Sequence, residues 1–201
     1  MKSLLILSLM LSLVSCGGFK AKRVDAQESD DKASEITDNW MATDTTLAIK
    51  DVLKQIQEHK GFQRYLAKKG GNPKVFIGEV QNTTSEAYFP IADLNDELLN
   101  EISKSGDFTL IDAAAREKIL GEIKYQNDGM VDPKTAKTIG KQTGADLMIF
   151  GNVYMKPESR GGKTIKEYSL NLRMTNIESA EEVLRTRAKI QKFSKQSSVG
   201  W

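Results

Sequence analysis

The stretch EYSLNLRMTNI, Glu167 to Ile177, is followed after five residues by VLRTRAKIQKF, Val183 to Phe193. In both segments apolar and polar residues alternate, which is the period-two pattern of a strand with one buried face. The second segment has an apolar side and a basic side, formed respectively by Leu184, Ala188 and Ile190 and by Arg185, Arg187 and Lys189. Joined by the short ESAEE loop, the two segments predict an antiparallel β-hairpin.

Three further strands are expected upstream of this hairpin. KVFIGEV, Lys74 to Val80, and DLMIFGNV, Asp146 to Val153, are continuous apolar runs. Such runs are typical of inner strands that are covered on both faces. FTLID, Phe108 to Asp112, predicts a short strand between them. The chain should therefore form a sheet of about five strands.

Helices are expected between and before the strands. Apolar residues recur at helical spacing from Leu47 to Ile56, and the apolar face resumes at Phe62 after a break near Gly61. A second helix is expected from about Pro90 to Ser103, and SGD, Ser105 to Asp107, should end it.

Two more helices are expected before the second apolar strand. Asp112 can cap a helix whose Ile119, Leu120 and Ile123 should face inward. Asp132 followed by Pro133 predicts the start of the next helix, with Gly144 as its end. The order of elements predicts the α/β (α+β) class, with a mixed sheet of about five strands flanked by helices and ending in an antiparallel hairpin. Residues 39–201 should form this single domain.

The N-terminus has the composition of a secretory signal. A basic residue, Lys2, precedes about twelve mostly apolar residues from Ser3 to Val14. A membrane-spanning helix needs about 20 apolar residues, so this segment is too short for a permanent span. Residues 1–15 are expected to be a signal peptide that is removed by cleavage after Ser15.

The chain has one cysteine, Cys16, placed directly after this segment. Leu13-Val14-Ser15-Cys16 resembles the lipobox of bacterial lipoproteins, which implies that Cys16 is acylated and anchors the chain to a membrane. The alternative is an ordinary signal peptide with a chance cysteine. Gly17 and Gly18, where the enterobacterial sorting pattern has Asp for inner-membrane retention, imply the periplasmic face of the outer membrane. Residues 16–38 have few large apolar residues and predict a flexible tether.

Composition and motifs argue against several classes of function. Without Lys2 the chain has 28 basic and 27 acidic side chains, so its charge does not favour nucleic acid. RGGKT, Arg160 to Thr164, lacks the first glycine of a phosphate-binding loop and lies between strands, so a hairpin loop is expected and nucleotide binding is not. The single histidine, His59, has no catalytic or metal-ligating companions in the sequence, which predicts a structural role.

No carboxylate pair or nucleophile is evident, so a non-enzymatic protein without cofactors or metal is expected. Glu79 ends a strand, but a glycosidase would need a second carboxylate near it. The basic side chains Arg185, Arg187 and Lys189, with Lys192 and Lys195 beyond them, could meet an acidic partner. The commoner role of such a stripe is a solvated strand face that discourages edge-to-edge aggregation.

KVFIGEVQNTTSEAYF, Lys74 to Phe89, together with GDFTLID, GADLMIFGNVYMK and YSLNLRMTNIESAEEV, resembles the LpoB family of lipoproteins that activate penicillin-binding proteins. The resemblance covers about residues 39–193. It implies a TolB N-terminal-domain-like fold and a non-enzymatic outer-membrane lipoprotein that docks on a class A penicillin-binding protein and stimulates peptidoglycan synthesis. The resemblance leaves the docking residues undefined. The alternative, implied by the related CsgG-like lipoproteins, is a structural or accessory subunit of an outer-membrane secretion or surface-assembly system.

Overall fold

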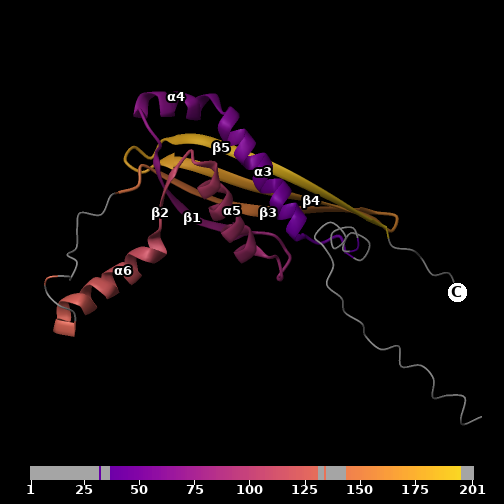
Figure 1. Cartoon of the computed structure of the whole chain (residues 1–201). Helices are drawn as coiled ribbons and strands as arrows, with labels where there is room; N and C mark the ends of the chain where they lie inside the picture. The colour runs from indigo at the N-terminus through magenta and orange to yellow at the C-terminus, as the bar shows by residue number, and fades with distance from the viewer. Residues whose placement is uncertain (1–31, 33–36, 131–133, 135–143, 196–201) are drawn as a thin grey trace, which may run out of the picture. The chain divides into compact units, whose positions relative to one another are not determined.

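The structure, a computed structural model, describes residues 32, 37–130, 134 and 144–195. The chain divides into two units, Met1–Glu35 and Ile36–Trp201. The second unit contains one mixed sheet among its described residues, and its helices lie between and before the strands (Figure 1). The strands are β1 (Lys74–Asn82), β2 (Thr109–Ile111), β3 (Leu147–Arg160), β4 (Lys163–Asn176) and β5 (Glu182–Lys195). The helices are α3 (Ala42–Glu58), α4 (Lys60–Lys69), α5 (Ile91–Ser105), α6 (Ala113–Tyr125) and the short π-helix η1 (Gln126–Met130).

The sheet has five strands in the order β2-β1-β3-β4-β5. Strand β1 pairs in parallel with β2 and β3, while β3, β4 and β5 form antiparallel pairs. The predicted α+β class and the terminal β4–β5 hairpin are therefore confirmed. Within the segment Arg160 to Thr164, Gly161 and Gly162 form the tight turn between β3 and β4, with φ angles of 58° and 71°. Two consecutive positive φ values suit the two-residue hairpin turn that glycine favours.

The first helical region breaks two residues earlier than expected. Helix α3 ends at Glu58 and α4 begins at Lys60, with His59 between them in an extended conformation. The Nδ1 atom of His59 accepts a hydrogen bond of 3.2 Å from the Phe62 backbone N–H, so this histidine caps α4. A side chain at Gly61 would lie 2.8 Å from the His59 ring, which explains the glycine beside the break.

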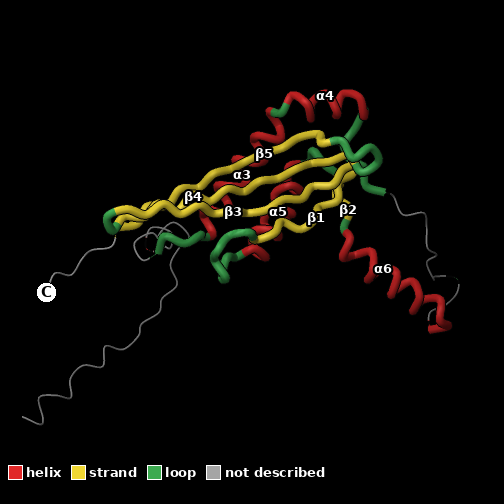
Figure 2. The backbone as a smooth tube through the Cα atoms, turned by 180° about the vertical axis from the view of Figure 1, so that it is seen from behind, coloured by secondary structure: helices red, strands yellow, loops and turns green. Residues whose placement is uncertain are grey.

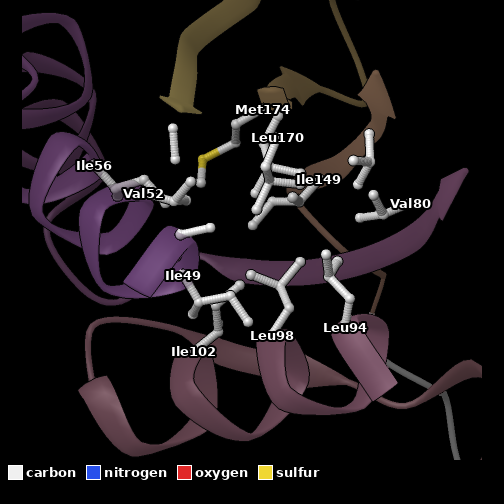
Figure 3. Packing of buried hydrophobic residues seen from close by; sticks show 14 of the residues in the cluster. Ile49, Val52, Ile56, Val80, Leu94, Leu98, Ile102, Ile149, Leu170 and Met174 are labelled. Carbon is white, nitrogen blue, oxygen red and sulfur yellow. The ribbon is translucent and has the colours of Figure 1, made fainter. Parts of the chain in front are cut away.

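The hydrophobic core lies between one face of the sheet and helices α3 and α5. In Figure 2 both helices lie behind the strands, on that face of the sheet. Figure 3 shows side chains of both helices meeting those of β1, β3 and β4. Helix α5 contributes Leu94, Leu98 and Ile102, which are fully buried and follow the helical spacing expected from the sequence. Gly106, with φ of 69°, ends this helix within the SGD segment, as predicted.

The other face of the sheet is not covered by any described helix (Figure 2). Burial therefore alternates along β1 and β3: Val80 and Val153 are fully buried, while Gln81 and Tyr154 are exposed. The expectation that these two strands are covered on both faces was wrong. Their outward positions also carry apolar residues, such as Phe76, Met148 and Phe150, which are half-buried, so the sequence runs are continuous although one face is open.

Helix α6 also departs from expectation. Its cap is as predicted, since Asp112 Oδ1 accepts a 2.9 Å hydrogen bond from the Ala115 backbone N–H. However, Ile119 and Leu120 are exposed and Ile123 is half-buried, so the inward face expected for these residues was wrong. The helix follows β2 at the sheet edge and leads away from the sheet (Figure 1). The helix expected from Asp132-Pro133 falls almost wholly outside the described residues.

Candidate interaction surfaces

The lipid-attachment residue expected from the sequence, Cys16, lies outside the described residues. Within the part of the chain that the structure describes, no helix combines the length and apolar character needed to cross a membrane. In that same part, no group of three or more His, Cys, Asp or Glu side chains could hold a metal ion. The candidate interaction surfaces in the described residues are the open face and edges of the sheet and a groove beside α4.

The basic side of β5 lies on the open face and is extensively paired. Arg185 contacts Glu182 at 2.7 Å, and Lys189 contacts Glu167 at 2.9 Å. Arg187 donates from Nε to Asn171 Oδ1 at 2.8 Å. The pKa of Glu167 is lowered, mainly by the hydrogen bond from Gln191 and also by the one from Lys189. These neighbours neutralise much of the stripe, in keeping with a solvated strand face.

A shallow depression occupies the other half of the open face, across β1 and β3. It has a volume of about 480 Å³ and is lined by residues that include Met148, Phe150 and Arg173. The Arg173 guanidinium lies 4.9 Å from the centre of the Phe150 ring, a cation–π distance. At Gly78 a side chain would lie 2.8 Å from Met148 Cε, so the glycine lets these outward side chains lie flat against β1.

A larger groove of about 950 Å³ lies between α4 and the β4–β5 turn. One wall carries Arg64 and Lys68 of α4, and the opposite wall carries Glu178 and Glu181 of the turn. At its end Lys69 Nζ contacts Asp146 Oδ1 at 2.5 Å. Burial raises the pKa of Asp146, but hydrogen bonds from Lys69 and the Lys74 backbone N–H outweigh it and lower the pKa.

A cluster of charged and polar side chains connects the start of the folded unit to the beginning of β4 and the end of β5, which pair with each other. We call it the entry cluster: Asp38, Glu86, Lys166, Tyr168 and Ser194. Lys166 Nζ lies 2.8 Å from Asp38 and 2.9 Å from Glu86. Ser194 donates to Asp38 and Tyr168 donates to Glu86, each at 2.5 Å. These five side chains, from four segments of the chain, therefore hold the residues just before α3 against the sheet.

Burial perturbs the two donors at the centre of this cluster in different ways. Burial would lower the pKa of Lys166, but its hydrogen bonds to Asp38 and Glu86 raise it overall. Burial and the hydrogen bond to Glu86 both raise the pKa of Tyr168, so its hydroxyl remains a donor.

A second buried ion pair lies close to the entry cluster. Lys192 Nζ contacts Asp44 Oδ2 at 2.7 Å, and the two side chains are only 13% and 7% exposed. Asp44 Oδ2 also accepts from the Met41 backbone N–H at 2.9 Å, which satisfies a free donor at the start of α3. Trp40 packs beside them, with its ring centre 5.2 Å from that of Phe89 and 5.3 Å from that of Tyr168.

The entry cluster predicts a specific acid sensitivity. Hydrogen bonds from Lys166 and Ser194 lower the pKa of Asp38 below its ordinary value of 3.8. When folding lowers the pKa of a carboxyl group, its ionised form stabilises the fold at pH values above the unfolded-state pKa. This stabilisation is lost as the pH falls through the folded-state pKa. We therefore expect Asp38→Asn to cost about 1 kcal/mol of unfolding free energy at pH 6 and progressively less below about pH 4.

Urea unfolding between pH 2.5 and pH 6 measures this difference. Asp51→Asn, at an exposed position on α3, is the matched control and should leave the pH dependence unchanged. A constant difference between wild type and Asp38→Asn across the whole range would contradict the prediction.

The entry cluster and the Lys192–Asp44 pair were not predicted from the sequence, and Lys192, which was grouped with the solvated basic stripe, is instead buried against Asp44. A signal was present, since Lys192 follows Ala188 and Ile190 at period two and so falls on the apolar side of β5. Lys166 likewise precedes Tyr168 and Leu170 on the buried side of β4. A lysine on the apolar side of an alternating strand indicates a buried carboxylate partner, but the partner's identity depends on tertiary packing.

Comparison with known proteins places this fold. The LpoB family, described as peptidoglycan-synthase activator LpoB, matches residues 44–190. No curated protein sequence matches the chain. Among solved structures, the LpoB C-terminal domain from Escherichia coli is similar, with 14% identity, a TM-score of 0.43 and coverage of 73% of this chain and 96% of that one.

Two other solved structures show weaker or comparable similarity. The LpoB C-terminal domain from Salmonella enterica has 11% identity and a TM-score of 0.41, with the same coverage of 73% and 96%. The PelC dodecamer from Paraburkholderia phytofirmans has 14% identity and a TM-score of 0.35, covering 63% of this chain and 76% of that one. The family match spans most of the folded unit, from the buried Asp44 to Ile190 in the last strand. The chain therefore belongs to the LpoB family of peptidoglycan-synthase activators.

Proposed function

We propose that this protein is a periplasm-facing lipoprotein that binds and activates a class A penicillin-binding protein. The family match over residues 44–190 is the observation that carries the proposal. LpoB proteins are regulatory activators, and their role requires a binding surface instead of a catalytic constellation. The paired charges and shallow depressions of the described surface are compatible with docking onto another protein.

Activation would be a coupling between binding and the activity of the synthase. The activator must bind the active conformation of the enzyme more tightly than its resting conformation, because equal affinity would shift no population. A coupling of about 1 to 3 kcal/mol changes the equilibrium about five- to 150-fold. A folded domain can supply this difference through its binding surface without contributing any reacting group.

The anchor in this proposal is Cys16. Acyl chains on its thiol and new N-terminus would hold the protein at the periplasmic face of the outer membrane, since several chains together give stable attachment. The folded unit begins near Ile36, so about 20 residues separate it from Cys16. Cys16→Ser should abolish acylation and release the protein into the soluble periplasmic fraction, which membrane fractionation measures.

The test of activation uses the full protein in detergent with the class A penicillin-binding protein of the same organism. Glycan polymerisation from a lipid-linked precursor is followed at increasing concentrations of the protein. We expect a saturable rise in rate within the five- to 150-fold range of typical coupling. A synthase that is active alone and shows neither binding nor a change in rate at micromolar protein would overturn the proposal for that partner.

A further inference from the structure

The outer edge of β5 presents main-chain groups that point away from the sheet. Strand β5 is the last strand in the sheet order and pairs only with β4. Gln55 of α3 bonds the outward groups of Arg187, accepting from its N–H at 3.0 Å and donating to its C=O at 2.9 Å. Main-chain groups alternate in direction along an antiparallel strand, so those of Lys189, Gln191 and Phe193 also point outward.

This second half of the edge has no main-chain partner within the described residues. No hydrogen bond from another described segment reaches the outward N–H or C=O groups of Lys189, Gln191 or Phe193. Helix α3 reaches this half of β5 only on the buried face of the sheet, where Asp44 bonds Lys192, whereas Lys189, Gln191 and Phe193 direct exposed side chains to the open face. Among the described residues, the edge is therefore closed at Arg187 and open beyond it.

An exposed apolar pair lies at the open half of the edge. Phe193 of β5 and Ile165 of β4 are direct cross-strand partners on the open face. Their side chains are 63% and 43% exposed, although cross-strand apolar pairs usually stabilise a sheet by being covered. An added strand beside β5 would bring side chains within reach of Phe193.

The charge of β5 selects among possible occupants of the edge. Between Val183 and Lys195 the strand has no carboxylate, and four basic residues lie on its exposed side, Arg185, Arg187, Lys189 and Lys195. Glu182 and Glu167 bond Arg185 and Lys189 within the sheet, but these two cations remain 59% and 50% exposed. A second copy of this strand would place basic side chains against basic side chains, which is unfavourable. A segment that carries Asp or Glu would instead add attractive pairs with Lys189 and its basic neighbours.

We propose that the edge from Lys189 to Phe193 accepts an extended acidic segment of a partner protein, which adds to the sheet as a sixth strand. The segment would place a carboxylate near Lys189 and an apolar side chain against Phe193. Five residues of β5 span about 14 Å, enough for a short strand. Main-chain hydrogen bonds would give affinity and these two side-chain contacts would give specificity. The inference rests on the proposed function, because the penicillin-binding protein is the partner expected to supply the segment.

Gln191→Pro tests the main-chain part of this docking. Proline removes the outward N–H of residue 191 but no bond to β4, and proline is tolerated on edge strands. Gln191→Ala is the matched control, since it also loses the side-chain hydrogen bond to Glu167 but keeps the N–H. We expect Gln191→Pro to weaken binding to the synthase about tenfold or more, while Gln191→Ala binds within about twofold of wild type.

A second pair of variants tests the charge and remains informative if the proline variant fails to fold. Lys189→Glu reverses the charge at the open edge and should also weaken binding about tenfold. Lys118→Glu makes the same charge change at an exposed position of α6, which follows β2 at the opposite edge of the sheet, and should leave binding nearly unchanged. Circular dichroism and thermal unfolding establish that each variant is folded.

The outcomes separate this inference from the proposed function. If wild type activates the synthase and the folded Gln191→Pro and Lys189→Glu variants activate it equally well, the edge inference is wrong and the activator role stands. If wild type neither binds nor activates the synthase, the proposed function is wrong, and the edge inference, which rests on it, is overturned with it. If sedimentation shows a dimer of wild type that Gln191→Pro dissociates, the occupant is a second copy and the acidic-segment inference is overturned.

Discussion

Replacing Lys192 with methionine is expected to lower the free energy of unfolding by about 3 kcal/mol. The substitution keeps an unbranched side chain of similar length but leaves Asp44, which is 7% exposed at its side chain, without its cation. A buried carboxylate that loses its partner keeps its desolvation penalty without the compensating attraction. The pair also sets the start of α3, because Asp44 accepts from the Met41 N–H.

Urea unfolding at pH 7 measures this change. Lys189→Met is the matched control, since its partner Glu167 is more exposed and the pair lies on the open face, so the stability should change little. A double variant, Lys192→Met with Asp44→Asn, should recover part of the loss because the uncompensated charge is removed. A loss in Lys192→Met no greater than that in Lys189→Met would contradict the prediction.

Gly151→Ala is expected to cost about 3 kcal/mol or more. A Cβ atom at this position would lie 2.1 Å from the backbone oxygen of Asn171 and 2.7 Å from a methyl of Leu172. The first contact is with main chain in the centre of the sheet, so a rotamer change cannot relieve it. Strands β3 and β4 would have to separate locally, which weakens their pairing at Gly151 and Leu172.

Thermal or urea unfolding of Gly151→Ala tests this expectation. Gly121→Ala in α6 is the matched control, because a Cβ there has no neighbour within 4 Å. Alanine is the better helix former, so the control should stabilise α6 by up to about 1 kcal/mol. If Gly151→Ala unfolds with the same midpoint as wild type, the close approach of β3 and β4 at this glycine is not as described.

The proposed docking and the buried pairs occupy different sides of β5. Arg187, Lys189 and Gln191 lie on the open face, whereas Lys192 lies among the helices and bonds Asp44. Variants of Lys192 should therefore act through stability, and variants of Lys189 through binding. Measuring both quantities for each variant distinguishes a structural lysine from one that meets a partner.

Local patterns in the sequence predicted the order of the described strands and the mixed type of the sheet. The alternation from Glu167 to Phe193 predicted the β4–β5 hairpin, because side chains on a strand have a fixed period of two. Asp112 and Gly106 marked a helix start and a helix end through contacts within a few residues. These features depend on neighbours close in the chain, so they are visible without tertiary information.

Only the tertiary structure decided which faces are covered and which charges are paired. The apolar runs of β1 and β3 could not show that the described helices cover only one face, because the outward residues, such as Met148 and Phe150, are apolar as well. Asp38 and Asp44 meet Lys166 and Lys192 over separations of more than 120 residues. Gln55 closes one half of the β5 edge and leaves the other half open. Such contacts depend on how distant segments pack, and no local periodicity in the chain encodes them.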